Sequence, residues 1–446
     1  MAFVHSISTE SLKSELDLFA VPLTQTSVES GSWVPYKPVT SLSDSTVIDF
    51  VVPGRGDFYL DPAHTMIQIT AKITNADDTI LAVSAPVAPV NYWLHSLFGQ
   101  VDVYLNQKLI TPSASTYPYR AYLETLLNYD TGAKSTHLQN GLWFKDSAGD
   151  FDTLTVDNTG FNTRQTLTAR SQEVVMMGRL HSDLFRQDRF LLNGVEMGIK
   201  LIRSRDAFNL TKGGDADFQV KVVITDATLL VRQVRINPSV LIAHSRALEK
   251  ATAKYPLTRV EIKTVTIPAQ LMSKSIDNLI LGVLPKRVVL GFVLNTAFIG
   301  SLDVNPFNFQ HFNLNHLVLH VDGNQIPSKP LSPSFAAGSS AFVPMYHNLL
   351  TGCGISTGDH GNDISRAEYG ANGFVLTAFD LTPDLSANSG VWGLQRHGNL
   401  RLEVRFSQAL ANPITSIVYA EFDKPIEIDF DRTVTTDYSS YTCKLV

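Results

Sequence analysis

The chain has 446 residues, of which 44% are hydrophobic and only 17% are charged, and its formal net charge is −6. This length fits two β domains of roughly 200 residues each, and the negative charge argues against a dedicated nucleic-acid-binding protein. The two cysteines, Cys353 and Cys443, exclude a disulfide framework and favour synthesis in a reducing compartment, and no apolar run of ~18 residues predicts a transmembrane helix.

Residues 1–45 are polar, rich in Ser and Thr, and interrupted by single apolar residues. No basic segment followed by an apolar stretch occurs here, so we expect no signal peptide. The apolar anchors of this segment are Leu16, Leu18, Phe19, Val21, Leu23, Trp33 and Tyr36. We interpret the segment as an N-terminal arm that packs against this subunit or an adjacent one. The alternative is a disordered tail.

Strand signals begin at residue 47. Residues 66–73 alternate apolar and polar positions, which is the period of a half-buried strand, and residues 47–52 and 101–105 are also predicted strands. A short helix is predicted over residues 119–127, because its apolar residues recur three and four positions apart. Residues 130–190 are polar with little periodicity, and we predict surface loops there.

A segment bounded by prolines, residues 238–256, predicts a helix that links two β regions. Leu241, His244, Leu248 and Ala251 share one face of that helix. Strand signals return at residues 260–267.

The second half contains a strong hairpin signal. Residues 317–321 form a predicted strand that leads into Asp322-Gly323-Asn324, a turn whose residues tolerate positive φ. A second core-facing helix is expected around Met345, Leu349 and Leu350, although its spacing is less regular.

The two halves carry the same strand plan in the same order. The matched segments are residues 101–106 with 317–322, 193–201 with 398–406, and 228–232 with 417–421. The likeness lies in pattern and turn position rather than in identical residues. The offsets between residues 101 and 317, 195 and 400, and 230 and 418 fall from 216 to 205 to 188, which indicates longer loops in the first half. Many strands, frequent turns and no βαβ rhythm predict antiparallel β-sandwiches.

Motifs that would carry chemistry are weak. The one G-x-S-x-G string, residues 354–358, lies in a Gly-rich loop without the strand and helix that a nucleophile elbow needs, so we interpret it as a chance match. Residues 359–363, with Glu368, offer oxygen ligands for Ca²⁺, but their spacing departs from an EF-hand and favours a solvated turn. We expect no catalytic, cofactor-binding or metal site.

Three other groups are candidates for binding. His311, His316 and His320 are read as ordinary hydrogen-bonded histidines. The basic patches are residues 203–206 and 232–235, which could meet DNA phosphates but more readily form salt bridges between subunits.

Residues 305–315 alternate aromatic and amide side chains. Stacking on nucleic-acid bases is one reading of such a pattern. The favoured reading places the phenylalanines at a barrel rim or a contact between subunits, with the amides satisfying loop backbone.

Four segments, together with the doubled strand plan, carry a resemblance to a known family. They are residues 91–98 (NYWLHSLF), 117–124 (YPYRAYLE), 192–195 (LNGV) and 305–309 (NPFNF), while residues 14–18 (SELDL) match by pattern only. The chain resembles the double jelly-roll major capsid proteins of Polinton/Maverick elements, adintovirus-like agents and related large eukaryotic DNA viruses. The resemblance covers nearly the whole chain, and its motifs are structural rather than catalytic.

The resemblance implies an all-β fold of two tandem jelly-roll β-barrels, a double jelly roll, with short helices in loops and a linking helix. The expected division is an N-terminal arm over residues 1–45, a first jelly roll over 46–237, a linking helix over 238–256, a second jelly roll over 257–432 and a C-terminal tail over 433–446.

The implied function is that of a structural major capsid protein without enzymatic activity or cofactor. Three copies would form a homotrimer, whose six barrels make a pseudo-hexagonal capsomer that tiles an icosahedral shell around double-stranded DNA. Implied partners are neighbouring capsomers, penton or vertex proteins and minor capsid proteins, with at most weak, non-specific contact with packaged DNA. The implied location is the virion capsid, after synthesis inside the host cell.

Two alternatives stay open. One is a minor virion protein of the vertex or receptor-binding kind, which the doubled strand plan disfavours. The other is a β-sandwich carbohydrate-binding protein, which the missing secretory signal and the wide spacing of the four tryptophans disfavour.

Overall fold

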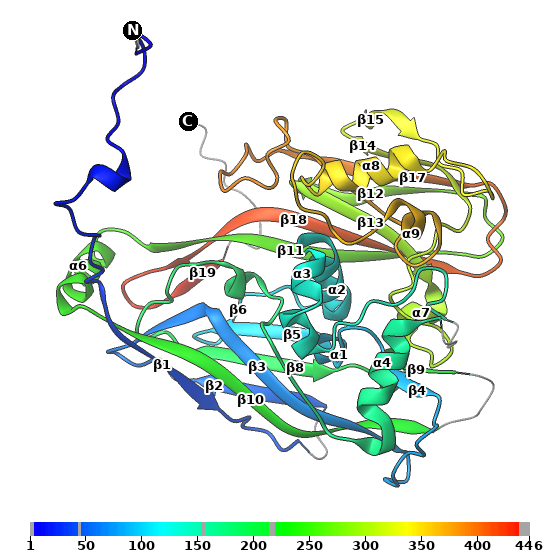
Figure 1. The fold of residues 1–446 in the computed structure, drawn as a ribbon, viewed down its shortest axis with the longest axis horizontal. Helices are drawn as coiled ribbons and strands as arrows, with labels where there is room; N and C mark the ends of the chain where they lie inside the picture. Colours follow the sequence, from blue (N-terminus) through cyan, green and yellow to red (C-terminus); the bar gives the residue numbers. More distant parts are fainter. Residues whose placement is uncertain (1–3, 43–45, 153–156, 214–218, 437–446) are drawn as a thin grey trace.

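Antiparallel strands dominate the chain (Figure 1). The computed structural model describes residues 4–42, 46–152, 157–213 and 219–436. Within them, each half of the chain forms two facing sheets built around four strands, and a short ladder of β4 (Val87–Pro89) with β9 (Leu210–Lys212) lies outside these sheets.

The first half forms one barrel from eight strands. One sheet has the order β1-β10-β3-β7, with bounds Val28–Tyr36, Val220–Ile236, Tyr59–Asn75 and Val174–Gly178. The facing sheet has the order β2-β8-β5-β6, with bounds Val47–Val52, Met197–Arg203, Phe98–Leu105 and Lys108–Leu109.

The second half forms a second barrel. One sheet has the order β11-β18-β13-β16, with bounds Ala253–Ile267, Ile414–Ile428, Arg287–Leu294 and Leu376–Asp380, and β19 (Val434–Thr436) adds to β18. The facing sheet has the order β12-β17-β14-β15, with bounds Ser273–Val283, His397–Phe406, Leu314–Val321 and Asn324–Leu331.

The two barrels have the same topology. If the eight strands of each barrel are numbered in chain order, one sheet reads 1-8-3-6 and the other reads 2-7-4-5 in both halves. This is the strand order of a jelly roll. The three segment pairs matched from the sequence fall on β5 and β14, β8 and β17, and β10 and β18, which hold equivalent places, so the predicted repeat is confirmed.

Helices occupy the connections. The α-helices are α1 (Trp93–Ser96), α2 (Tyr117–Asn128), α3 (Thr131–Lys134), α4 (Thr159–Thr168), α5 (Asp206–Asn209), α6 (Pro238–Leu248), α7 (Asn295–Ile299), α8 (Val343–Gly352) and α9 (Arg366–Gly370). Short 3₁₀ turns are η1 (Ser14–Leu16), η2 (His137–Gly141), η3 (Ala169–Ser171) and η4 (Asp183–Arg186). The helices expected over residues 119–127 and around Met345 are therefore confirmed as α2 and α8.

The hydrophobic alternation explains the sheets. In β3, Ile67, Ile69, Ala71 and Ile73 are fully buried, while the polar residues between them face outward. The hairpin between β14 and β15 also follows the sequence, because Asp322 and Gly323 both adopt positive φ and pair Val321 with Asn324. These are the conformations of a type I′ turn, whose twist matches that of the strands.

Two features differ from the sequence-based expectation. The prediction of surface loops for residues 130–190 is wrong, since α4 and β7 lie there and Trp143 and Phe151 are 1% exposed. The polar residues of that region bond within the protein: Asn158, for example, caps α4 through the backbone N–H of Phe161. Part of the polarity of this region therefore satisfies buried groups of the protein, as Asn158 does.

The expected division of the chain also differs from the observed elements. The segment assigned to the arm contains β1, an edge strand that pairs with β10 along Val28–Tyr36. The linking helix α6 ends at Leu248, so β11 begins inside the range 238–256. Residues 437–446 of the expected tail lie outside the described residues, and β19 occupies its start.

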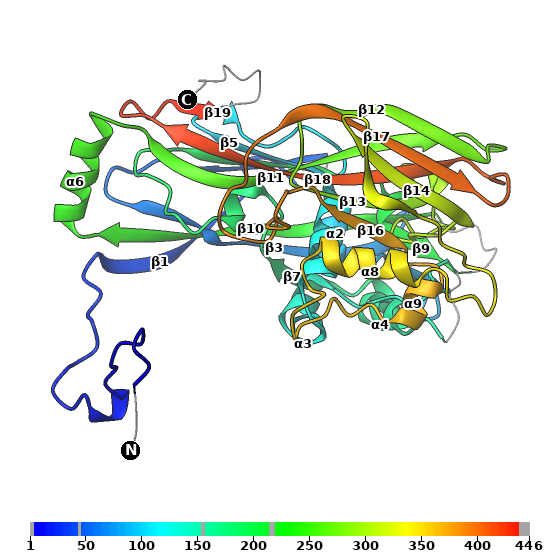
Figure 2. The same ribbon diagram turned by 90° about the horizontal axis from the view of Figure 1, so that it is seen from above.

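The two barrels share their hydrophobic interiors. α2, with Trp143 and Phe151, packs into the core of the second barrel, while Tyr255, Leu257 and Ile426 of the second barrel pack into the core of the first. Figure 1 shows α2 between the two barrels, beside β11 and β18 of the second barrel, and Figure 2 shows α6 at one end of the molecule. The junction is thus a continuous packed region rather than a flexible link.

Candidate functional site at the junction of the two barrels

The helix α2 lies inside the junction, and every residue from Tyr117 to Leu127 is buried. Most of these residues are apolar, but Arg120 and Glu124 are not. They are four positions apart, so both side chains project from the same face, and Nε of Arg120 lies 3.0 Å from Oε1 of Glu124. A buried ion pair needs further partners to offset its desolvation.

Glu124 receives those partners from three other elements. Nδ1 of His181 donates to its Oε2 at 2.7 Å, and Nη1 of Arg186 lies 3.0 Å from its Oε1. The hydroxyl of Tyr419, on β18 of the second barrel, lies 3.4 Å from Oε1. Because Nδ1 of His181 donates, its Nε2 accepts from the hydroxyl of Tyr92 at 3.0 Å.

The network continues into the second barrel. Nη2 of Arg120 donates to Oδ1 of Asp183 at 2.5 Å, and the same oxygen accepts from the backbone N–H of Val260 on β11 at 3.3 Å. Tyr419 donates to Glu421 at 3.0 Å, and Glu421 lies 3.6 Å from Arg287 on β13. The network therefore contains three guanidinium groups and three carboxylates, and the contacts of Tyr419 with Glu124 and of Val260 with Asp183 join its two halves.

Burial and charge act in opposite directions on these groups. Burial alone raises the pKa of Glu124, but Arg186, Arg120 and His181 together hold that pKa well below its usual range. Burial raises the pKa of Asp183 despite its pairing with Arg120, and burial lowers the pKa of His181. The arrangement therefore favours an ionised Glu124 beside a neutral imidazole.

The aromatic and amide segment of the second half forms a second contact with α2. Phe307 stacks on Tyr122 with ring centroids 4.3 Å apart and parallel planes. Asp152 anchors the segment by accepting from the backbone N–H of Asn305 at 2.7 Å and from Nδ2 of Asn308 at 2.6 Å. The phenylalanine thus fills a contact between the two barrels of one chain, where the sequence suggested a rim or a contact between subunits.

The candidate calcium loop meets lysines of the first half. Nζ of Lys145 lies 2.7 Å from Glu368 and bonds to the backbone carbonyl of Asp363, and Nζ of Lys134 donates to the carbonyl of Asn362 at 2.7 Å. Glu368 also completes a capping box with Ser365 at the start of α9. Within the described ranges, no group of three or more His, Cys, Asp or Glu residues is placed to hold a metal ion.

The histidine group divides into two parts, because His316 and His320 lie on β14 near Glu403 while His311 lies before that strand. His311 stacks on Phe335 at 4.4 Å, and His320 lies 3.9 Å from Glu403. Of the basic patches, Arg232 pairs with Asp61 at 2.6 Å within the chain. These side chains serve the fold of the single subunit.

The G-x-S-x-G string follows the helix α8, where a nucleophile elbow needs a strand. Cys353, at the end of that helix, is buried, and burial raises the pKa of its thiol to about 12. A reactive cysteine needs a lowered pKa and access to solvent, so this thiol has the character of a packing residue. In the part of the chain that the structure describes, no helix is long and apolar enough to cross a bilayer.

The sequence analysis missed the charged network at the junction. A signal was nevertheless present, because Arg120 and Glu124 are charged residues, four positions apart, in a helix whose other residues are mostly apolar. Buried charges on a core-facing helix require partners from elsewhere. The identity of those partners, such as Asp183 and Tyr419, depends on how distant segments meet.

Comparison by sequence finds a relative that extends over nearly the whole chain. No protein-family model matches the chain. An uncharacterized protein of Caenorhabditis elegans is 24% identical over 428 residues, which cover 94% of this chain and 99% of that protein.

Solved structures of viruses match nearly the whole chain. A chain of the Sputnik virophage matches with a TM-score of 0.64 and 13% identity, covering 97% of this chain and 94% of its own. The mavirus major capsid protein matches with a TM-score of 0.54 and 12% identity, covering 99% and 98%. The Faustovirus major capsid protein matches with a TM-score of 0.54 and 10% identity, covering 92% of each chain. The chain therefore has the double jelly-roll fold of these viral major capsid proteins, as its repeated strand plan predicts.

Proposed function

We propose that this chain is a structural major capsid protein, and that three copies form a pseudo-hexagonal capsomer that tiles an icosahedral shell around double-stranded DNA. The observation that carries the proposal is the same jelly-roll order in two barrels joined through shared cores. The match to viral major capsid proteins over more than nine-tenths of the chain supports it.

The geometry of the junction suits a tile. A trimer of two-barrel subunits presents six similar barrels, and a closed ring of this kind uses contacts between unlike surfaces. Six-fold packing fails if the two barrels move against each other. Directional contacts between the two halves, such as the hydroxyl of Tyr419 with Glu124 and the backbone N–H of Val260 with Asp183, select one relative orientation of the barrels, which apolar packing alone specifies less sharply.

The proposal keeps the expected division into two jelly-roll domains and assigns no catalytic role or cofactor. Its partners are neighbouring capsomers, penton or vertex proteins and minor capsid proteins, and its location is the virion, after synthesis inside the host cell. We further propose that the chain is of the Polinton/Maverick kind. A relative encoded by an animal, Caenorhabditis elegans, and covered over 99% of its length supports an origin in a mobile element of animal genomes.

The decisive experiment measures the assembly of the full-length protein. Light scattering on the purified chain is expected to give the mass of a trimer, and electron microscopy is expected to show particles with a pseudo-hexagonal outline. A chain that stays monomeric at every concentration, with no six-barrel particles, would contradict the proposal.

A further inference from the structure

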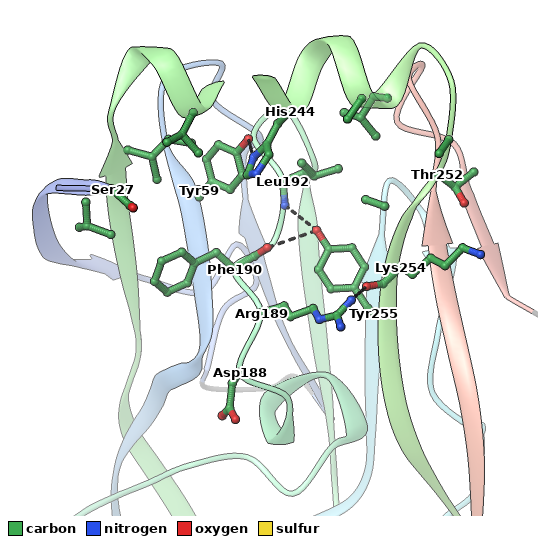
Figure 3. A pocket seen from close by; sticks show the side chains of 17 residues that line it. Ser27, Tyr59, Asp188, Arg189, Phe190, Leu192, His244, Thr252, Lys254 and Tyr255 are labelled. Carbon is green, nitrogen blue, oxygen red and sulfur yellow. Dashed lines mark hydrogen bonds between the residues drawn. The ribbon is translucent and has the colours of Figure 1, made fainter. Parts of the chain in front are cut away.

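A cavity lies at the end of the first barrel that α6 closes (Figure 3). Its volume is about 550 Å³, and its walls come from α6, β11, residues 188–192 and the start of β1. The walls are almost entirely apolar, with Phe190, Leu192, Val240 and Leu248 among them. Sites for small ligands start at roughly 300 Å³, so the space accepts several side chains.

Most of the polar groups that line this cavity are already paired within the protein. The hydroxyl of Tyr59 lies 3.1 Å from Nδ1 of His244, and the hydroxyl of Tyr255 donates to the carbonyl of Phe190 at 3.2 Å while accepting from the N–H of Leu192 at 3.1 Å (Figure 3). A polar ligand would find few free partners among them. The cavity therefore suits an apolar occupant.

The N-terminal arm supplies such an occupant. Phe19, Val21 and Leu23 are 98%, 84% and 103% exposed, so none of them contacts the body of its own chain. They are spaced two apart, with Ala20 and Pro22 between them, and an extended chain places such residues on one face. This apolar edge of the arm has no partner within the single subunit.

The arm starts at the mouth of the cavity but leads away from it. Ser27 and Val28 line the cavity, and the side chain of Gln25 bonds to both the N–H and the carbonyl of Val28 at 2.7 and 3.0 Å. This contact fixes the root of the arm, and Figures 1 and 2 both show the preceding residues leaving the body. The eight residue steps from Phe19 to Ser27 span up to about 26 Å when extended, enough to reach an adjacent subunit.

We propose that the apolar edge of the arm, formed by Phe19, Val21 and Leu23, binds the α6 cavity of a neighbouring copy of this chain. The inference rests on the proposed function, because it needs neighbouring copies in a defined assembly. It names the surface through which the arm joins one subunit to the next. Since every subunit carries one arm and one cavity, each copy gives one contact and receives one.

Disulfide trapping in the full-length protein tests the contact. Two differently tagged variants are co-expressed, one with Val21→Cys and the other with Ala251→Cys, a cavity residue. Both also carry Cys443→Ser, and the remaining thiol of Cys353 is buried. Oxidation is expected to yield a covalent dimer that contains both tags. Ser245→Cys replaces Ala251→Cys as the control, because Ser245 is exposed on α6 and does not line the cavity.

Two further variants separate docking from chance proximity. Ala247→Trp in the cavity-bearing chain fills the cavity and is expected to reduce the rate of cross-linking. Phe19→Ala in the arm-bearing chain removes the largest apolar side chain of the arm edge. We expect Phe19→Ala to reduce the rate of cross-linking roughly 10- to 100-fold, from the usual transfer free energy of a buried Phe side chain. Ser245→Trp, at an exposed position outside the cavity, is expected to leave the rate unchanged.

The outcomes distinguish this inference from the proposed function. Trimers and shells without a mixed-tag product would overturn the docking and leave the capsid role standing. An intrachain disulfide in a Val21→Cys, Ala251→Cys double variant, with no mixed-tag product, would show that the arm binds its own cavity and would also overturn it. A monomer without cross-links would overturn both.

Discussion

Replacing Glu124 with Gln tests the junction most directly. The amide keeps the shape of the side chain but removes its charge, so Arg120 and Arg186 lose a shared counter-ion and His181 loses a carboxylate acceptor. Breaking a buried ion pair costs about 3–5 kcal/mol. The side chain of Arg186 is about a third exposed, and water can replace part of its pairing, which places the expected cost near 3 kcal/mol.

The change is measurable as a melting temperature. For a barrel of ~200 residues, each kcal/mol shifts the midpoint by roughly 2–4 °C, so Glu124→Gln is expected to melt about 6–12 °C below the wild type. Circular dichroism at one fixed scan rate provides the readout, since large proteins often unfold irreversibly.

Glu173→Gln is the matched control for this experiment. Glu173 pairs with Lys72 at 3.3 Å, and its side chain is 50% exposed. Exposed pairs contribute ~0–1 kcal/mol, so the control is expected to melt within about 4 °C of the wild type. If Glu124→Gln lowers the melting temperature no more than the control does, the network does not stabilise the junction, and it does not hold the two barrels in a rigid arrangement.

Three further predictions concern other parts of the molecule. Burial holds the pKa of His95 well below its ordinary value of 6.5, so as the pH falls below about 6.5 only the unfolded chain binds this proton, and the free energy of unfolding in urea should decline. His95→Gln should lessen that decline, and an equal decline in the wild type and the variant would contradict the role of His95. Gly323→Ala should cost about 1 kcal/mol of unfolding free energy, because its φ is +81° and nothing else crowds an added Cβ, whereas Gly56→Ala, also uncrowded but without positive φ, should not destabilise. Phe307→Ala should cost about 3–5 kcal/mol by removing a buried ring stacked on Tyr122, and an unchanged urea midpoint would refute that role.

Much of the fold was predictable because its determinants are local. The alternation of Ile67, Ile69, Ala71 and Ile73 predicts β3, and Asp322-Gly323 predicts the hairpin after β14. The prediction failed at β1 and β7, both at the edges of a sheet, where few residues are buried and the alternation is weak. Edge strands form because a neighbouring strand offers unpaired backbone groups, which their own residues do not reveal.

By itself, the sequence determined the class of fold, the doubling of the strand plan and the absence of a recognisable catalytic motif, because side-chain period and turn chemistry act over a few residues. Only the tertiary structure decided how the two barrels join. The partners of Glu124, the stacking of Phe307 on Tyr122 and the cavity beneath α6 each combine residues far apart in the chain. The alternation of apolar and polar residues indicates that one face of a strand is buried, but it does not identify the surface that covers this face. That partner depends on the packing of the whole subunit.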